Sequence, residues 1–223
     1  MFFNVNAFSS EDVADGIIRV MPQPCAWLVT HGTSCAELLG FLSGALCVYL
    51  VTRQSIWNWP LGVITAAFYI VVFSREGLYS DTGLQVVYLI LSCYGWWHWT
   101  HGGKSTAGVL VTRVSARELA LLLTVGIALC LVLWSVTVRL PGARVPLFDA
   151  ALTATSLVAQ YMMTRKYLEN WILWIVADVF YIGLFFARDL QLTALLYTVY
   201  LALAIYGFVQ WKRSLARVSS GSF

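Results

Sequence analysis

The chain has 223 residues, of which 60% are hydrophobic and only 11% are charged, and its mean hydropathy is +0.75. About a quarter of the residues of a soluble domain are charged, so this composition excludes a water-soluble globular protein and predicts an integral membrane protein. The apolar runs are continuous rather than alternating, which favours helices over a β-barrel. The formal net charge of +3 is spread over loops, so no nucleic-acid-binding patch is indicated.

Seven apolar segments approach the roughly 20 residues that a helix needs to cross a bilayer. They are residues 36–53, 57–74, 82–101, 117–138, 148–165, 170–187 and 190–211. In residues 1–35, Ile17, Ile18 and Met21 predict a short interfacial helix. We therefore predict an all-α integral membrane fold of seven transmembrane helices, followed by a tail of residues 212–223.

The lysines and arginines predict the orientation of these helices. With seven spans, nine of these residues lie on one side of the membrane and five on the other. Basic residues are enriched in cytoplasmic loops. We expect the larger set to be cytoplasmic, which places the N-terminus outside and the C-terminus inside a bacterial inner membrane.

An internal repeat relates the first and last three segments. Residues 58–99 and 170–211 align without a gap at an offset of 112, with 16 identities in 42 positions. The identities include Asn-Trp, Phe-Tyr-Ile, Tyr-Gly and a terminal Trp, which general apolar composition does not explain. The repeat predicts two parallel three-helix units, 36–101 and 148–211, joined by a linker helix at 117–138. A duplicated scaffold without a transport pathway is the alternative.

The strongest candidate site lies where the two units differ. Trp171, Trp174 and Asp178 recur at helical spacing on one face of the sixth segment. Their repeat counterparts are Trp59, Gly62 and Ala66. An aspartate near the bilayer centre costs about 2.5–3.5 kcal/mol on insertion scales, which favours a functional role over a structural one. Trp171 stands at a helix end, so an interfacial position is equally consistent with the sequence.

Polar residues on two neighbouring segments extend this candidate site. One face of the third segment carries Gln85, Tyr88, Ser92 and Gly95, and one face of the fifth carries Asp149, Thr153, Ser156 and Gln160. Each residue alone favours a helix-packing hydrogen bond over a ligand contact, whereas together they predict a polar lane that faces Trp171, Trp174 and Asp178. Trp96, Trp97 and Trp99 close the third segment, and we interpret them as interfacial belt residues.

Indoles beside a carboxylate favour a flat cationic ligand through cation–π attraction and charge pairing. Catalysis is not indicated, because the three histidines lie at or beyond segment ends and no nucleophile motif is present. The five cysteines have no metal-like spacing, so we expect neither a metal site nor a cofactor. Cys47, Cys93 and Cys130 fall in apolar runs and are expected to be small buried hydrophobes.

Several motifs together resemble the PnuC family of nicotinamide riboside transporters. In the first half these are NWPLG (58–62), LYSDTGLQ (78–85) and YGWWHW (94–99). In the second half they are Lys166-x4-Trp171-x2-Trp174-x3-Asp178, LLY (195–197) and YGFVQW (206–211). The resemblance covers about residues 36–213.

The resemblance implies a SWEET-like fold of three, one and three helices, a homotrimer, and facilitated diffusion made one-way by phosphorylation of the substrate inside the cell. Nicotinamide riboside has a cationic pyridinium ring, in agreement with the Trp-Asp face. Thiamine or another B vitamin is the alternative substrate, and a receptor that does not transport is a further alternative. The candidate substrate-binding residues are Trp171, Trp174, Asp178, Gln85, Tyr88, Gln160, Trp59, Asn58 and Tyr197.

Overall fold

The computed structural model describes residues 35–75, 79–102, 109–139, 146–187 and 191–219, and these residues form seven α-helices. In chain order they are α3 (Cys35–Thr52), α4 (Asn58–Arg75), α5 (Tyr79–His101), α6 (Ala116–Thr137), α7 (Pro146–Thr164), α8 (Asn170–Phe186) and α9 (Gln191–Ser219). The expected all-helical fold is confirmed. The interfacial helix expected near Ile17 lies outside the described residues.

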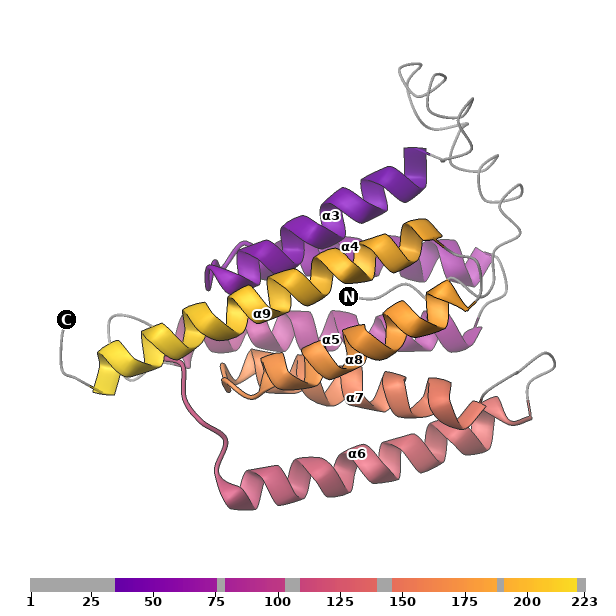
Figure 1. The fold of residues 1–223 in the computed structure, drawn as a ribbon. Coiled ribbons are helices and arrows are strands. Elements are labelled where there is room, and N and C mark those ends of the chain that lie inside the picture. The colour runs from indigo at the N-terminus through magenta and orange to yellow at the C-terminus, as the bar shows by residue number, and fades with distance from the viewer. Residues whose placement is uncertain (1–34, 76–78, 103–108, 140–145, 188–190, 220–223) are drawn as a thin grey trace.

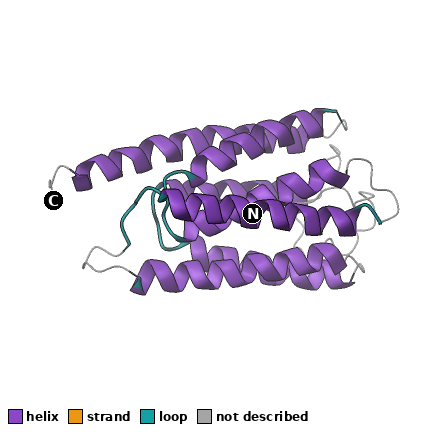
Figure 2. Ribbon diagram, turned by 90° about the horizontal axis from the view of Figure 1, so that it is seen from below, coloured by secondary structure: helices purple, strands orange, loops and turns teal. Residues whose placement is uncertain are grey.

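The helices run side by side with roughly parallel axes (Figures 1 and 2). The loops 53–57, 109–115 and 165–169 gather at the end of the bundle where the C-terminus lies, which we call the C-terminal end. Helix α6 lies at the edge and packs mainly on α7. The two predicted repeats meet through α3 against α9 and α5 against α7, which are repeat-equivalent helix pairs.

Hydropathy is distributed unevenly among the helices. In the described chain, two helices are by themselves long and apolar enough to cross a membrane, Ala116–Thr137 and Thr193–Arg217. Shorter apolar stretches lie within α3 (Leu42–Thr52), α4 (Asn58–Val71) and α8 (Asn170–Phe186). Fewer helices than the seven expected meet this length, because the apolar stretches of these three are shorter than 18 residues in the described chain. Helix α6 is different, since only 6% of its most apolar window is buried, as suits a helix surrounded by lipid.

Local signals account for several helix ends. Ser115 and Glu118 form a reciprocal capping box that begins α6. Helices α3 and α7 end in the same Schellman geometry, in which Gln54 and Lys166 take φ of 54° and 53°. These two residues are related by the repeat offset of 112, so the two corners share an unusual backbone conformation. Helix α9 continues to Ser219, eight residues past the predicted end at 211, because its basic last turns remain helical although they are not apolar.

Candidate substrate site

A small cavity lies between the two predicted repeats. It measures about 50 Å³, and residues from α3, α4, α5, α7, α8 and α9 line it. By the usual requirement of about 10–15 Å³ for one water molecule, it holds a few waters. A vitamin-sized molecule therefore enters only if the helices move apart.

Helix α8 supplies the face that the sequence singled out. Trp171, Trp174 and Asp178 all line the cavity and are 1%, 3% and 1% exposed. The interfacial interpretation of Trp171 is therefore wrong, since its indole is fully buried between helices. Among the described residues, no hydrogen-bond donor reaches Asp178 Oδ1. Burying a carboxyl oxygen without a hydrogen-bond partner costs free energy. A bound ligand that donates to this oxygen would remove that cost.

The first repeat forms the opposite wall. Asn58, Trp59 and Tyr88 line the cavity there, joined by Ser92 and Gly62. Gly62 is the repeat counterpart of Trp174. Ser92 packs closely against it, because a Cβ added to Gly62 would lie 3.1 Å from Ser92 Oγ. In the described part of the chain, Asn58 Nδ2 and Trp59 Nε1 are buried without hydrogen-bond partners. This wall therefore offers polar donors in addition to an indole.

Seven of the nine predicted site residues line one cavity. These are Asn58, Trp59, Tyr88, Gln160, Trp171, Trp174 and Asp178. The other two, Gln85 and Tyr197, are buried at 4% and 1% exposure but do not line it. Tyr197 instead packs against Tyr181 and Tyr200, with ring centroids 4.8 and 5.5 Å away.

The prediction missed Cys47, Met163 and Tyr200, which also line the cavity. Tyr200 is the repeat counterpart of Tyr88, so the offset of 112 was the signal that could have found it. Cys47 is buried as expected, whereas Cys93 is exposed and Cys130 partly so; the expectation for these two cysteines is wrong because their helix faces lie on the outer surface. In the described chain, no cluster of histidine, cysteine and acidic residues suits a metal ion.

Next to the cavity, the corner between α7 and α8 is tied to the segment that leads into α6. Thr112 pairs with this corner through two backbone hydrogen bonds, Thr112 N to Lys166 O at 3.1 Å and Leu168 N to Thr112 O at 2.9 Å. Val114 N donates to Glu169 Oε2 at 3.0 Å. We call residues 109–114 the strap; it fixes the loop from which α8 begins.

Lys166 occupies the centre of this corner and is 7% exposed. Its Nζ donates to Val109 O at 2.9 Å and lies 4.2 Å from the centroid of the Trp99 ring. A weaker contact of 3.5 Å joins Nζ to Gln54 Oε1, its repeat counterpart. Burial lowers the pKa of Lys166 to about 8, because a low-dielectric site disfavours the ammonium form.

Residues 34–213 match the nicotinamide mononucleotide transporter family, and they include all the residues that line the cavity. The chain belongs to this family. It is thus a member of a family of membrane transporters and not of enzymes.

Family members with known functions span nearly the same length. The nicotinamide riboside transporter PnuC of Escherichia coli is 26% identical over 209 residues, which cover 82% of this chain and 87% of that protein. The PnuC of Haemophilus influenzae is 26% identical, covering 90% and 88%. The riboflavin/roseoflavin transporter RibM of Streptomyces davaonensis is also 26% identical, covering 79% and 84%.

The family fold is shared as well. A crystal structure of the vitamin B3 transporter PnuC superposes with a TM-score of 0.65 at 25% identity and covers 92% of this chain and 88% of that one. The chain is therefore a vitamin transporter of this family with a common fold. The chain is equally similar, at 26% identity, to a nicotinamide riboside transporter and to a riboflavin transporter. Overall similarity therefore does not distinguish these substrates, and the choice between them rests on the residues of the site.

Proposed function

We propose that this protein takes up nicotinamide riboside. The observation that carries the proposal is Asp178, a buried carboxyl one turn from Trp174 on the cavity wall, with no hydrogen-bond partner for Oδ1 among the described residues. A pyridinium ring stacked on an indole gains cation–π attraction of about 0.5–2 kcal/mol. The carboxylate supplies the matching charge, which a neutral isoalloxazine ring does not require.

The donors on the opposite wall suit the sugar. Asn58 Nδ2 and Trp59 Nε1 have no partner in the described chain and face the same cavity. Ribose hydroxyls are acceptors for such groups, and buried donors gain most when a ligand satisfies them. Thiamine is the second candidate, because it is also a flat cation and the acid does not separate the two.

We infer facilitated diffusion, with phosphorylation inside the cell holding the product there, and a homotrimer with a cytoplasmic C-terminus in a bacterial inner membrane. Support comes from the family resemblance and the distribution of basic residues. Downhill movement needs no ion-coupling site. The trimer would bury part of the apolar outer face, where residues such as Ile127 and Phe186 are 63% and 61% exposed.

The test measures binding by tryptophan fluorescence quenching in detergent. Nicotinamide riboside is compared with thiamine, with riboflavin, and with the uncharged dihydro form of nicotinamide riboside, which matches it closely in shape. We expect tightest binding for nicotinamide riboside and a loss of that preference over the dihydro form in Asp178→Asn. Tight riboflavin binding, or an unchanged preference in Asp178→Asn, would contradict the proposal.

A further inference from the structure

Two tryptophans of the sequence repeat have no place in the site described so far. Trp99 and Trp211 are 5% and 0% exposed, and neither lines the cavity. Their neighbours Trp96 and Trp97 are 41% and 58% exposed, as belt residues are. The belt interpretation is therefore wrong for Trp99, whose indole points into the bundle.

Each of these indoles is hydrogen-bonded across the boundary between the repeats. Trp99 Nε1 of α5 donates to Thr164 O at the end of α7, at 3.1 Å. Trp211 Nε1 of α9 donates to Val51 O in the last turn of α3, also at 3.1 Å. Thr164 O is one of the last carbonyls of α7, which have no partner within their helix, whereas Val51 O also accepts from Gln54 N at 2.8 Å. The two bonds join the same helix pairs, α5 with α7 and α9 with α3, that hold the repeats together.

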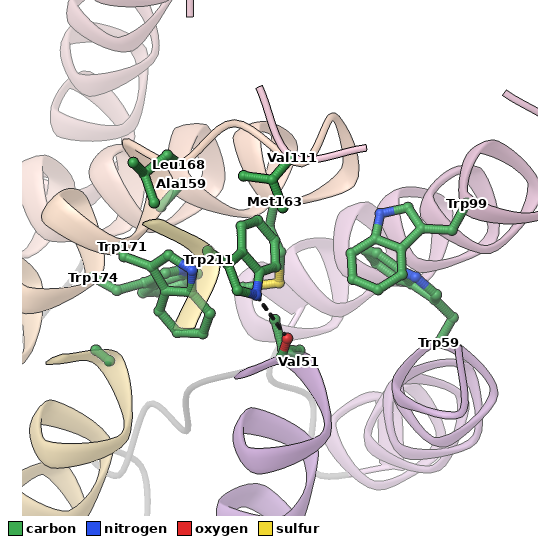
Figure 3. Close-up of a cluster of buried hydrophobic side chains, with 11 residues drawn as sticks. Val51, Trp59, Trp99, Val111, Ala159, Met163, Leu168, Trp171, Trp174 and Trp211 are labelled. Carbon is green, nitrogen blue, oxygen red and sulfur yellow. Dashed lines mark hydrogen bonds between the residues drawn. The ribbon is translucent and has the colours of Figure 1, made fainter. Parts of the chain in front are cut away.

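The same indoles form a continuous row across the bundle. Trp59 meets Trp99 edge-on at 5.2 Å, Trp99 lies 6.2 Å from Trp211, and Trp211 meets Trp171 edge-on at 5.4 Å. The row runs from Trp171 through Trp211 to Trp99 and Trp59 in Figure 3, where the bond from Trp211 to Val51 is drawn. Its outer members Trp59 and Trp171 line the cavity, and its inner members do not.

The position of the row identifies what it separates. Trp59 and Trp171 lie in the first turns of α4 and α8, next to the loops 53–57 and 165–169 at the C-terminal end. Trp174 and Asp178 lie about one and two turns deeper along α8. The row therefore stands between the cavity and the C-terminal end of the bundle. Indoles packed at centroid distances of 5.2–6.2 Å leave little room for water between them.

We propose that Trp99 and Trp211 are the gate of this transporter on the membrane face that carries the C-terminus. The gate opens when α3 separates from α9 and α5 separates from α7, which breaks both cross-repeat hydrogen bonds and divides the row between Trp99 and Trp211. The inference rests on the proposed transport function and names the residues that control passage at one side of its site.

Cys47 provides a reporter, because its buried thiol lines the cavity behind the row. The test uses a variant in which Cys25, Cys35, Cys93 and Cys130 are replaced by alanine, reconstituted in sealed vesicles of known orientation. A negatively charged, membrane-impermeant methanethiosulfonate reagent is added to one face at a time, and the rate of Cys47 modification is measured.

Trp99→Phe with Trp211→Phe keeps aromatic rings and removes both N–H donors. We expect Cys47 modification from the C-terminal face to become about tenfold faster, since two net hydrogen bonds no longer favour the closed state. Modification from the opposite face should stay at the parental rate. The matched control is Trp97→Phe, an exposed indole of the same helix, which should leave both rates unchanged. Parental rates in the double variant, or equal increases from both faces, would overturn the proposal.

The single variants Trp99→Phe and Trp211→Phe keep the proposal testable if the double variant misfolds. Each removes one bond and should give an intermediate increase of about threefold, provided that the detergent-solubilised protein remains monodisperse. Folded single variants that react at the parental rate would also overturn the gate. The thiol assay needs no substrate, so its outcome is independent of whether nicotinamide riboside proves to be the ligand.

Discussion

Replacing Gly207 of α9 by alanine tests whether Trp171 is held rigidly in place. A Cβ at this position would lie 2.5 Å from Cζ2 of Trp171 and 2.6 Å from its Cη2. Ordinary contact needs about 3.4–4 Å, so the indole would have to move by about 1 Å. It has little room to do so, because its ring packs edge-on against Trp211, which is itself hydrogen-bonded to Val51.

The magnitude follows from overpacking, which costs about 1–3 kcal/mol in a filled core. Alanine also stabilises a helix relative to glycine by about 0.8–1.0 kcal/mol. Gly183→Ala on α8 is the control for this gain, because a Cβ built there meets no atom within 4 Å and adds no overpacking. At about 2–4 °C per kcal/mol for a chain of this size, Gly207→Ala should melt about 2–12 °C below Gly183→Ala.

The assay is thermal unfolding in detergent, paired with ligand quenching on the same samples. Gly207→Ala should also bind ligand more weakly, since Trp171 lines the cavity. The repeat counterpart Gly95→Ala should act in the same direction, because its Cβ would lie 2.3 Å from Cη2 of Trp59. A Gly207→Ala protein that melts at or above Gly183→Ala would refute the tight packing of Trp171.

Three further outcomes are expected. Trp174→Ala should weaken binding of a cationic ligand severalfold more than Trp59→Ala, because only Trp174 lies one turn from Asp178; equal losses by fluorescence titration would move the site. Because burial lowers the pKa of Lys166 from 10.5 to about 8, the unfolded chain binds more protons in that range, and stability relative to Lys166→Met should rise as the pH increases from 8 to 10.5. Melting curves in which this difference stays constant would show that burial does not lower the pKa of Lys166. A phosphatase that is active only in the periplasm should show no activity when it is fused to the C-terminus, because we expect this end in the cytoplasm. Phosphatase activity would contradict the predicted orientation.

Hydropathy and the repeat predicted much of the fold but less of its interior. Six of the seven helices begin and end within three residues of the predicted segments, because apolar length sets their bounds. Trp59 and Trp171 were found as a pair through the repeat. Trp99 was misplaced, since a tryptophan at a helix end has the same sequence signal whether it faces lipid or a neighbouring helix. Only the contact with Thr164, 65 residues away along the chain, distinguishes the two.

Residues that line the cavity through close packing were hard to predict for a related reason. Met163 and Cys47 are ordinary apolar residues in apolar helices, and nothing in their local sequence separates a cavity wall from a lipid-facing surface. Asp178 was predictable because an acid in such a helix is costly wherever it points. Sequence therefore indicated the polar chemistry of the site, whereas its apolar outline depends on how the helices pack.

The strap makes the two halves mechanically unequal. Thr112 and Val114 bind the corner between α7 and α8, whereas the corresponding corner between α3 and α4 has no such contact among the described residues. The second repeat is thus tied to the linker helix, whereas the first repeat has no corresponding tie in the described chain. Trp174 and Asp178, which we propose to select the substrate, lie in the second repeat, and Asn58 and Trp59 of the first repeat face the same cavity. We therefore expect the second repeat to stay with the linker helix, and the first repeat to move against it, when the bundle opens.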